Sequence, residues 1–552
     1  MSSAMSTLTS LMGLQLFTRL FTFILNQALS RLASPVAYGI AAIQFELMLS
    51  TILFLSREGV RGALLRVKTG SDASVGSSDQ KQGVDAAMNV RFVPIIIGVP
   101  FAFATSSLYV AFAGTEILSQ AHFRSAVAVY VAAAVMELLA EPMHNMAMVN
   151  LKTHLRVRAE GVSITAKTLT TFFVLVYDAS RGHGDLALLA FAFGQLSYGA
   201  SLFFMYLREY REAVWPKTLS GESVLNSVLR TYFDRDMLAL SMTMTSQSLV
   251  KHFLTEGDKL ILSWFSPLQD QGGYALAVNY GSLIVRIVFQ PIEETMRLYF
   301  SRTLADVTTA PVSSSTSKNE KNTHQPVLKQ AADTLMTLLR MQAIGSLFVL
   351  IFGPAYISLL LNVLLPPKYL STSAPRVLEA WIWYLPVLAV NGGLEAFLAS
   401  VALPQDVNKQ SRWMILFTMI YITSAIALYR FELGDTALIY ANIINLSARI
   451  IYTARFVQGF FARHRASGFI KWWDVLPPWN LVVPFMISLL IVHSSETVFG
   501  ATAVVQRDGR MGILRRPVLL HIAVGGVLAL CCLALWAWNS RSQFRIYKSK
   551  TT

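Results

Sequence analysis

The sequence has few charged residues and few cysteines. Charged side chains make up only 14% of its 552 residues, whereas 54% are hydrophobic. A soluble globular protein needs a larger charged fraction to cover its surface, so the composition excludes that class and indicates a membrane protein. The two cysteines, Cys531 and Cys532, are adjacent inside an apolar run, which excludes a disulfide framework and a cysteine metal site.

Sequence motifs for nucleotide and metal chemistry are also missing. The chain contains no glycine-rich GK[ST] loop that could hold ATP, and no pair of histidines with an acidic residue at metal-ligand spacing. Transport driven by ATP hydrolysis on this chain is therefore excluded, and we expect no metal, no cofactor and no enzymatic activity. His122, His144 and His252 are isolated along the chain, so packing explains them better than metal binding does.

Apolar runs long enough to cross a bilayer recur along the whole chain. Because lipid offers the backbone no hydrogen-bond partners, spanning segments must be helices or a closed barrel, and runs of about 20 residues select helices. The sequence therefore predicts an all-α polytopic membrane protein. The fourteen expected spans are approximately 8–30, 36–56, 92–112, 125–149, 162–180, 185–207, 238–265, 274–300, 333–363, 376–402, 412–430, 434–458, 478–499 and 517–539.

Basic residues are concentrated in alternate loops. They cluster after spans two, six and twelve, while the connections on the other side carry almost no charge. Because basic loops stay in the cytosol, both termini are predicted to be cytosolic. The loop 507–516 is an exception, since this orientation places its four arginines outside. Topology and contact with anionic lipids explain the net charge of +14 better than nucleic-acid binding does.

Two parts of the sequence resemble each other at a nearly constant spacing. QLFTRLFTFILN, from Gln15, resembles QSLVKHFLTEGD, from Gln247, and the following spans match at an offset of 236 residues, as Tyr38 does with Tyr274. An even number of spans separates the pairs, so a duplication would give two lobes of one orientation, and chance similarity is the alternative. The predicted domains are an N-terminal lobe at 1–215, a C-terminal lobe at 216–475, and two further spans with a cytosolic tail at 476–552.

Basic side chains occur near the middle of three predicted spans. Arg19, Lys251 and Arg286 each lie about 15 Å from either end of their run, at about 1.5 Å of rise per residue. A cation at the centre of a lipid-facing helix costs at least about 2.5 kcal/mol, so these side chains should face a protein-lined or water-filled interior. Asn26 and Gln290 extend the helical stripes of Arg19 and Arg286. We expect these residues to line a cavity that favours an anionic ligand.

The central cations also have a purely structural explanation. They would then be buried ion pairs that hold helices together, for example Arg286 with Glu256 or Glu46. The apolar run of span seven is interrupted at 255–259, which includes Glu256 and Asp258, and this segment is either a local unwinding or only the outer end of the helix. Charges at the predicted cytosolic ends are explained equally well by topology and by salt bridges between the lobes, and these are Arg57, Glu58, Arg61, Glu293, Glu294 and Arg297.

Four segments resemble the signature segments of a known family. FTFILNQALSR, FLSREGVR, HFLTEGDKLILSWF and DQGGYALAVNYGSLIVRIVFQPIEE are similar to the Rft family of endoplasmic reticulum proteins, and together they cover about a tenth of the chain. That family belongs to the superfamily of multidrug extruders and bacterial peptidoglycan-lipid flippases. The resemblance implies functional positions at Arg31, Arg57, Arg61, Glu256, Arg286 and Glu294, with Arg449 as a looser match.

The resemblance also implies a function in protein N-glycosylation. It predicts that the chain moves a dolichol-pyrophosphate-linked oligosaccharide, with five mannoses and two N-acetylglucosamines, from the cytosolic to the lumenal leaflet. The central cations would neutralise the pyrophosphate. Two alternatives stay open, namely an ion-coupled exporter of small organic molecules that uses carboxylates such as Glu46, Glu137 and Glu141, and a non-transporting scaffold of the glycosylation machinery. The expected partners are the glycolipid and membrane lipids, without nucleic acid.

Overall fold

The computed structural model describes residues 23–24, 26–64, 88–150, 152–182, 184–211, 215, 233–309 and 318–549. Nearly all of these residues are helical, and no strand occurs among them. Twelve helices in this part of the chain are long and apolar enough to cross a membrane. The prediction of an all-α polytopic membrane protein is therefore confirmed.

Two of the fourteen predicted spans are absent from these twelve. The first, 8–30, lies almost entirely outside the described residues. The seventh corresponds to helix α11 (Arg235–Phe265), which is 31 residues long but more polar than the others, because charges recur along it at Glu256, Asp258 and Lys259. The number of spans thus agrees with the prediction approximately, and the exact number of fourteen stays a prediction.

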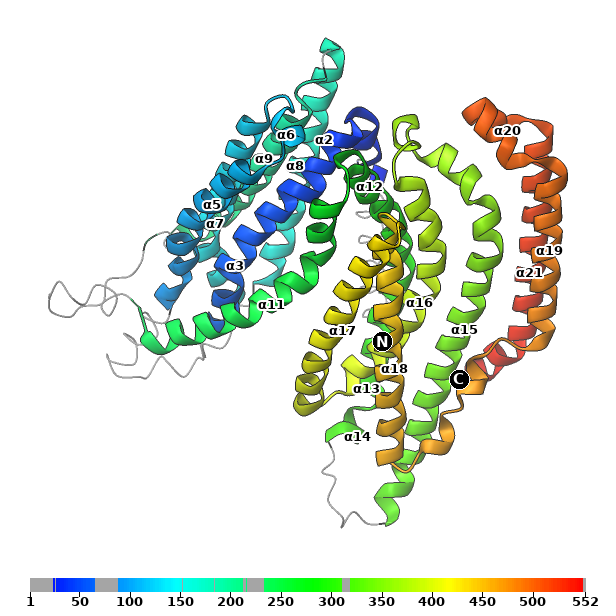
Figure 1. The fold of residues 1–552 in the computed structure, drawn as a ribbon. Coiled ribbons are helices and arrows are strands. Elements are labelled where there is room, and N and C mark those ends of the chain that lie inside the picture. Colours follow the sequence, from blue (N-terminus) through cyan, green and yellow to red (C-terminus); the bar gives the residue numbers. More distant parts are fainter. Residues whose placement is uncertain are drawn as a thin grey trace. The chain divides into compact units, whose positions relative to one another are not determined.

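The contacts between residues divide the chain into two compact units (Figure 1). The N-terminal unit contains the described residues up to Ala275, and the C-terminal unit contains those from Leu276 onward. The predicted domains were defined by the sequence repeat and not by these contacts. They are the lobes at 1–215 and 216–475 and the appendage at 476–552, and they stay a prediction.

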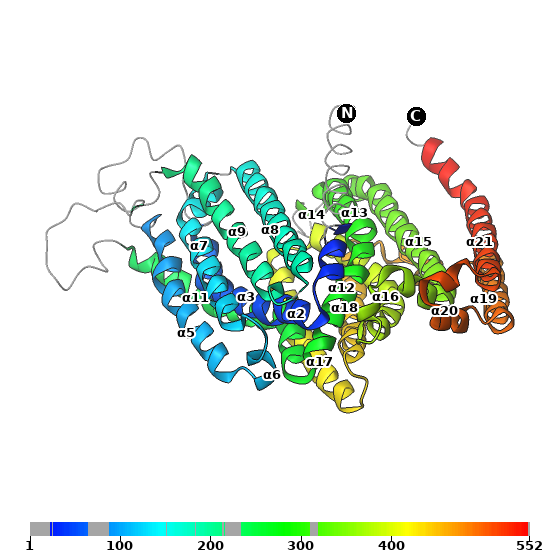
Figure 2. The ribbon, with the colours of Figure 1, turned by 90° about the horizontal axis from the view of Figure 1, so that it is seen from above.

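In the N-terminal unit, helix α7 occupies the centre of a bundle. It packs on α3, α5 and α9, while α8 packs on α9 and α11 packs on α3 (Figures 1 and 2). The elements are α2 (Pro35–Gly39), the π-helical segment η1 (Ile40–Phe45), α3 (Glu46–Leu64), η3 (Val90–Phe92), α5 (Val93–Phe112), α6 (Thr115–Leu118), α7 (Phe123–Val149), α8 (Thr153–Arg181), α9 (Ala187–Glu209) and α11. Helix α12 (Leu268–Ile284) begins in this unit.

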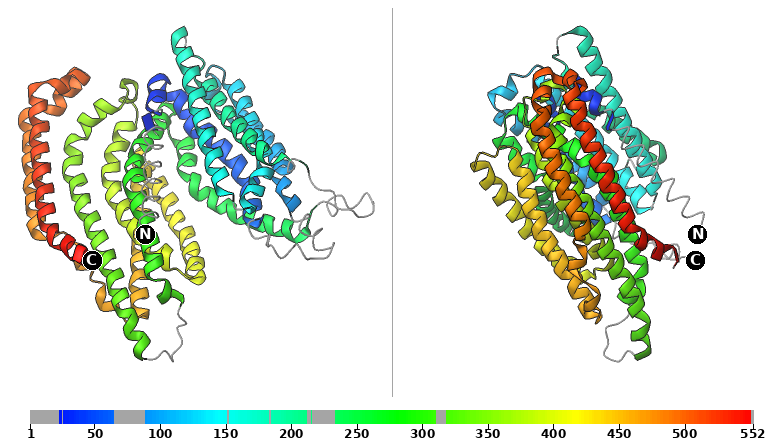
Figure 3. Two further views of the ribbon diagram at one scale, coloured as in Figure 1. Left: turned by 180° about the vertical axis from the view of Figure 1, so that it is seen from behind. Right: turned by 90° about the vertical axis from the view of Figure 1, so that its right-hand side faces the viewer.

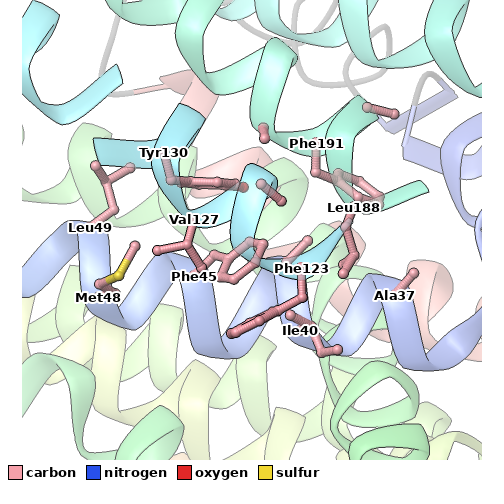
Figure 4. Packing of buried hydrophobic residues seen from close by; sticks show 14 of the residues in the cluster. Ala37, Ile40, Phe45, Met48, Leu49, Phe123, Val127, Tyr130, Leu188 and Phe191 are labelled. Carbon is pink, nitrogen blue, oxygen red and sulfur yellow. The ribbon is translucent and has the colours of Figure 1, made fainter. Parts of the chain in front are cut away.

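Aromatic side chains fill the core of the N-terminal unit where α7 meets the segment from α2 to α3. Phe45 packs against Tyr130 and Phe123, with ring centroids 4.7 and 6.0 Å apart, and all three side chains are buried (Figure 4). The helix starts at Pro35 because proline fits the first helical position and the Ser34 hydroxyl accepts a hydrogen bond from the Ala37 amide at 3.2 Å.

The C-terminal unit is built around helix α16. This helix packs on α13, α15 and α18, and α17 packs on α18. The elements are the π-helical segment η5 (Val285–Phe289), α13 (Gln290–Thr303), α14 (Ala305–Thr309), α15 (Lys318–Leu364), η6 (Pro367–Tyr369), α16 (Ala374–Val401), α17 (Pro404–Arg430), α18 (Thr436–Arg463), η7 (Ser467–Phe469), η8 (Trp472–Val475), α19 (Trp479–Phe499), α20 (Ala501–Asp508), η9 (Gly509–Leu514) and α21 (Arg516–Ser549).

The last helices lie at the edge of the C-terminal unit. Helices α19 and α21 run side by side, and α19 contacts α15 on the side away from α16 (Figures 2 and 3). Phe485 of α19 packs edge-to-face on Phe348 of α15, with centroids 4.6 Å apart, so this helix pair is attached to the bundle through α15.

The order of packed neighbours is the same in both units. The N-terminal unit joins α3 to α7, α7 to α9 and α9 to α8, and the C-terminal unit joins α13 to α16, α16 to α18 and α18 to α17. In the numbering of the predicted spans, the helices of the N-terminal unit are spans two, four, six and five, in this order. Those of the C-terminal unit are spans eight, ten, twelve and eleven. Equal packing at a spacing of six spans is the arrangement expected of two duplicated halves.

Candidate functional site

A cluster of buried charges joins α3 to α7 in the N-terminal unit. Arg57 and Arg61 lie one turn apart on α3, and Glu137 and Glu141 lie one turn apart on α7. Arg57 Nη1 is 3.2 Å from Glu141 Oε1 and 3.5 Å from Glu137 Oε2, and Arg61 Nε donates to Glu141 Oε2 at 2.9 Å. We call these four residues, together with Gln195, the N-terminal ion cluster.

Gln195 adds a hydrogen bond to this cluster. Its side-chain amide, on α9, donates to Glu137 Oε1 at 2.8 Å. Glu137 and Glu141 are only 3% and 1% exposed, and a carboxylate so buried stays ionised only when it is paired. The cluster holds two arginines and two glutamates, so its formal charges cancel. The sequence left topology and salt bridges between the lobes open for Arg57 and Arg61, and the structure places these arginines beside carboxylates of their own unit.

A second cluster of charges joins α13, α16 and α18 in the C-terminal unit. Arg449 on α18 donates through Nε to Glu395 Oε1 on α16 at 3.0 Å, and its Nη2 also contacts that oxygen. On α13, Arg297 Nη2 is 2.8 Å from Glu293 Oε1, one turn away. A Cβ atom on Gly392 would lie 3.4 Å from Glu293 Oε2, so that carboxylate rests against α16. We call these four residues the C-terminal ion cluster.

The two ion clusters occupy equivalent helices of the repeat. The N-terminal cluster uses α3, α7 and α9, and the C-terminal cluster uses α13, α16 and α18. In both units a carboxylate lies on the second of the three helices, Glu141 on α7 and Glu395 on α16. The cation that pairs with the middle helix comes from α3 in the first unit and from α18 in the second, at Arg61 and Arg449.

Arg286 lies in the π-helical segment η5, between α12 and α13. Its Nη2 is within 3.1 Å of the Asn279 side-chain oxygen and 3.2 Å of both the Asn279 carbonyl oxygen and the Ser282 hydroxyl. These contacts direct the guanidinium back along α12. A π-helical segment widens one turn of a helix and often marks a functional site. The pairs of Arg286 with Glu256 or Glu46 that the sequence left open join residues of different units, and they stay a prediction.

The other predicted substrate-binding residues are only partly within the described part of the chain. Arg19 lies outside it, and for Lys251 the structure describes the backbone of α11 but not the side chain. Residues 26–32 are helical, with Asn26 half-buried and Arg31 exposed, and Gln290 is exposed at the first position of α13. Their role in binding stays a prediction.

The charged segment 255–259 is part of a continuous helix. Helix α11 extends unbroken from Arg235 to Phe265, so a local unwinding at this segment was wrong, and the segment lies toward the C-terminal end of the helix. Glu256 Oε2 is 2.8 Å from Lys259 Nζ, and Asp258 accepts a hydrogen bond from the Tyr274 hydroxyl at 3.3 Å. The Asp258 contact therefore ties α11 to α12, while the pair of Glu256 with Lys259 stays within α11.

The two remaining predicted charges of the helix ends are Glu58 and Glu294. Glu58 on α3 is half-buried, next to the N-terminal ion cluster in sequence, and Glu294 on α13 is exposed. Gln195 is a functional candidate that the sequence analysis missed. The signal available for it was an amide inside the apolar run 185–207, where an unpaired amide would be costly.

The fold defines the class of the protein. The structure aligns with a solved structure described as the lipid II flippase MurJ in an inward closed conformation, over 96% of this chain and 99% of that one. The TM-score is 0.54 at 12% sequence identity, so the similarity concerns the fold. The chain thus has the fold of a polytopic membrane transporter, built from two similarly packed units.

The sequence comparisons identify the family. Residues 3–550 match the model of the Rft protein family, and the chain belongs to that family. It is 33% identical over 474 residues to the Man(5)GlcNAc(2)-PP-dolichol translocation protein RFT1 of Eremothecium gossypii, covering 82% of each chain. The protein of the same name from Saccharomyces cerevisiae is 31% identical over 487 residues, again covering 82% of each chain. The one from Schizosaccharomyces pombe is 31% identical over 493 residues, covering 87% of this chain and 86% of its own.

Proposed function

We propose that this protein translocates Man(5)GlcNAc(2)-PP-dolichol from the cytosolic to the lumenal leaflet of the endoplasmic reticulum membrane. The observation that carries the proposal is the match of nearly the whole chain to the Rft family, and the three relatives named above bear the name of this activity. The fold shared with a lipid flippase supports it, because a flippase must let a lipid head group pass through protein while the tail stays in the bilayer.

The physical task explains why the chain carries charges within its spans. A pyrophosphate and a cluster of sugar hydroxyls would lose their water in hydrocarbon, and each unsatisfied polar group would cost several kcal/mol. Arginine offers a fixed fork of donors that matches phosphate oxygens. In this proposal Arg286, together with Arg19, Lys251 and Arg31, receives the pyrophosphate, and Asn26 and Gln290 contact it or the first sugars. Alternating access then moves the head group without exposing it to lipid.

The two ion clusters have a different part in the proposal. Arg61 and Glu141 in one unit, and Arg449 and Glu395 in the other, connect helices of a single unit. Such contacts stiffen each unit, so that each can move as a body when access alternates. Arg57 connects helices in the same way, whereas Arg297 and Glu293 pair within α13 and contact α16 through the Glu293 carboxylate.

The engaged carboxylates count against export of organic cations. Such an exporter needs acidic groups that can receive a cation, and Glu137 and Glu141 were two of the three candidates, with Glu46 as the third. Both accept hydrogen bonds within the N-terminal ion cluster, Glu141 from two arginines and Glu137 from Arg57 and Gln195. A cation would have to displace these contacts before it could bind.

The cellular placement is part of the proposal as well. The alternation of basic loops supports cytosolic termini. The loop 507–516 still carries four arginines on the side predicted to be lumenal. Insertion of a glycosylation acceptor at each terminus and in this loop would test the orientation, and only the loop is expected to be modified in the lumen.

The experiment that tests the function uses the full-length protein purified and reconstituted alone in liposomes. Man(5)GlcNAc(2)-PP-dolichol is placed in both leaflets, and its accessible fraction is measured with a membrane-impermeant reagent. Wild-type protein is expected to make the inner pool accessible, and the double variant K251Q/R286Q is expected to leave it protected. If the wild-type protein shows no translocation while an extract of endoplasmic reticulum membranes does, the non-transporting scaffold is the better explanation.

A further inference from the structure

Helices α17 and α18 enclose a groove on the surface of the C-terminal unit. Its volume is about 630 Å³, and every residue that lines it belongs to these two antiparallel helices. Within its own unit α17 packs mainly on α18, so one side of this helix is left uncovered there. Trp413 and Ile451, on opposite walls, are 39% and 56% exposed.

The inner half of the groove is aromatic. Trp413 and Phe417 of α17 contact Tyr452 of α18, with ring centroids 5.6 and 6.0 Å apart. Leu416 and Ile420 continue this wall toward the middle of α17. The half that lies deeper in the predicted span therefore offers a surface suited to a hydrocarbon chain.

The outer half of the groove is cationic. Lys409 near the start of α17 faces Arg455 and Arg463 near the end of α18, and all three side chains are exposed. Among the described residues, no carboxylate lies within 4.0 Å of the charged nitrogens of these three side chains. Asp406 also lines the groove, but one of its carboxylate oxygens accepts from the Leu403 amide at 3.3 Å, at the start of its own helix.

The equivalent groove of the other unit has a different chemistry. It lies between α8 and α9, which correspond to α17 and α18 in the repeat, and has a volume of about 570 Å³. Its only charged lining residue among those described is Arg208, and its polar residues are Thr170, Ser197 and Ser201. A groove therefore follows from the packing of these helices, whereas the three cations belong to the C-terminal unit alone.

We propose that the groove between α17 and α18 binds an anionic glycerophospholipid of the surrounding bilayer. Lys409, Arg455 and Arg463 hold the phosphate and the charged head group, and one acyl chain lies along Trp413 and Phe417. Basic residues at the membrane surface attract anionic lipids, and the aromatic half excludes a fully hydrated ligand. The cationic end is also the end predicted to face the cytosol. This site does not depend on the proposed translocation activity.

The first test measures binding of fluorescent phosphatidylinositol to the purified full-length protein in detergent, with phosphatidylcholine as the neutral probe. Wild-type protein is expected to bind phosphatidylinositol and to prefer it strongly over phosphatidylcholine. Each of the variants K409Q, R455Q and R463Q is expected to weaken binding about fivefold. The matched control is R208Q, which removes a cation from the equivalent groove and is expected to leave binding unchanged.

The second test fills the groove without changing its charge. Gly459 lines the groove, and a Cβ atom added there meets nothing within 4 Å. The variant G459L should block the lipid, and leucine favours a helix more than glycine does, so a loss of binding would not reflect unfolding. Each of three results would overturn the proposal. The first is that G459L and the three charge variants all bind phosphatidylinositol as wild type does, and the second is that phosphatidylcholine binds equally well. The third is that dolichyl pyrophosphate displaces phosphatidylinositol at a lower concentration than unlabelled phosphatidylinositol does.

Discussion

Arg61 on α3 and Glu141 on α7 form a two-point ion pair. Arg61 Nε lies 2.9 Å from Glu141 Oε2, and Arg61 Nη2 contacts Glu141 Oε1. Only 2% of the Glu141 side chain is exposed, compared with 26% of the Arg61 side chain. The arginine thus reaches from the edge of the bundle to a carboxylate in its interior, and α3 cannot shift along α7 without breaking both contacts.

Removal of the arginine should destabilise the N-terminal unit. The variant R61M leaves Glu141 with Arg57 alone, and breaking a buried ion pair costs about 3–5 kcal/mol. We expect a clear fall in the thermal unfolding midpoint of the purified protein in detergent. The matched control is E209Q, which breaks the exposed pair of Lys152 with Glu209 and should leave the midpoint nearly unchanged. An equal effect of the two variants would rule out the structural role of Arg61.

The C-terminal ion cluster should contribute less to stability. The side chains of Arg449 and Glu395 are 21% and 22% exposed, so water can compensate for part of the stabilisation that is lost when their contact is broken. We expect R449Q and E395Q each to lower the free energy of unfolding by about 1–3 kcal/mol, and the double variant to cost less than the sum. The measurement is a double-mutant cycle on unfolding in detergent, and strictly additive effects would show that the pair is not coupled.

Two glycines allow α2 and α12 to approach closely. A Cβ atom on Gly272 would lie 1.9 Å from the Pro35 carbonyl oxygen, and one on Gly39 would lie 2.5 Å from the Leu268 carbonyl oxygen. Because these obstacles are backbone atoms, they cannot move aside cheaply. We therefore expect G272A to lower the free energy of unfolding by about 1–3 kcal/mol.

The matched control for this prediction is a glycine with open space. Gly526 lies in α21, and a Cβ atom there meets nothing within 4 Å. G526A should keep or raise stability, by up to about 1 kcal/mol, because alanine is the better helix former. Both variants are compared by thermal unfolding in detergent, and a neutral G272A would contradict the close approach of the two backbones.

The sequence predicted the features that depend on composition and on the spacing of apolar and charged residues along the chain. Apolar runs identified the helices, and the cost of a charge in lipid singled out Arg286. The partner of Arg61 could not be predicted, because Glu141 is 80 residues away and only the packing of α3 on α7 brings them together. For the same reason Gln195 was missed, since its role depends on the neighbouring Glu137.

The error at α11 has a physical explanation too. Gly257 flanked by charges suggested a break, since glycine is a weak helix former. The helix continues because those charges find partners that do not require unwinding. Glu256 pairs with Lys259 one turn away, and Asp258 accepts from Tyr274 on α12. The charges of this segment are therefore satisfied without a break in the helix.

The most direct measurement of the proposed function is the rate at which purified protein in liposomes moves Man(5)GlcNAc(2)-PP-dolichol, compared between wild type, R286K, R286Q and R302Q. A charge-assisted hydrogen bond to phosphate is worth about 1.5–3 kcal/mol, so R286Q should slow translocation about tenfold or more, while R286K retains part of the rate. R302Q, which removes an exposed cation at the end of α13, should match wild type. A rate for correctly folded R286Q equal to that of wild type would contradict the role of Arg286 in receiving the pyrophosphate.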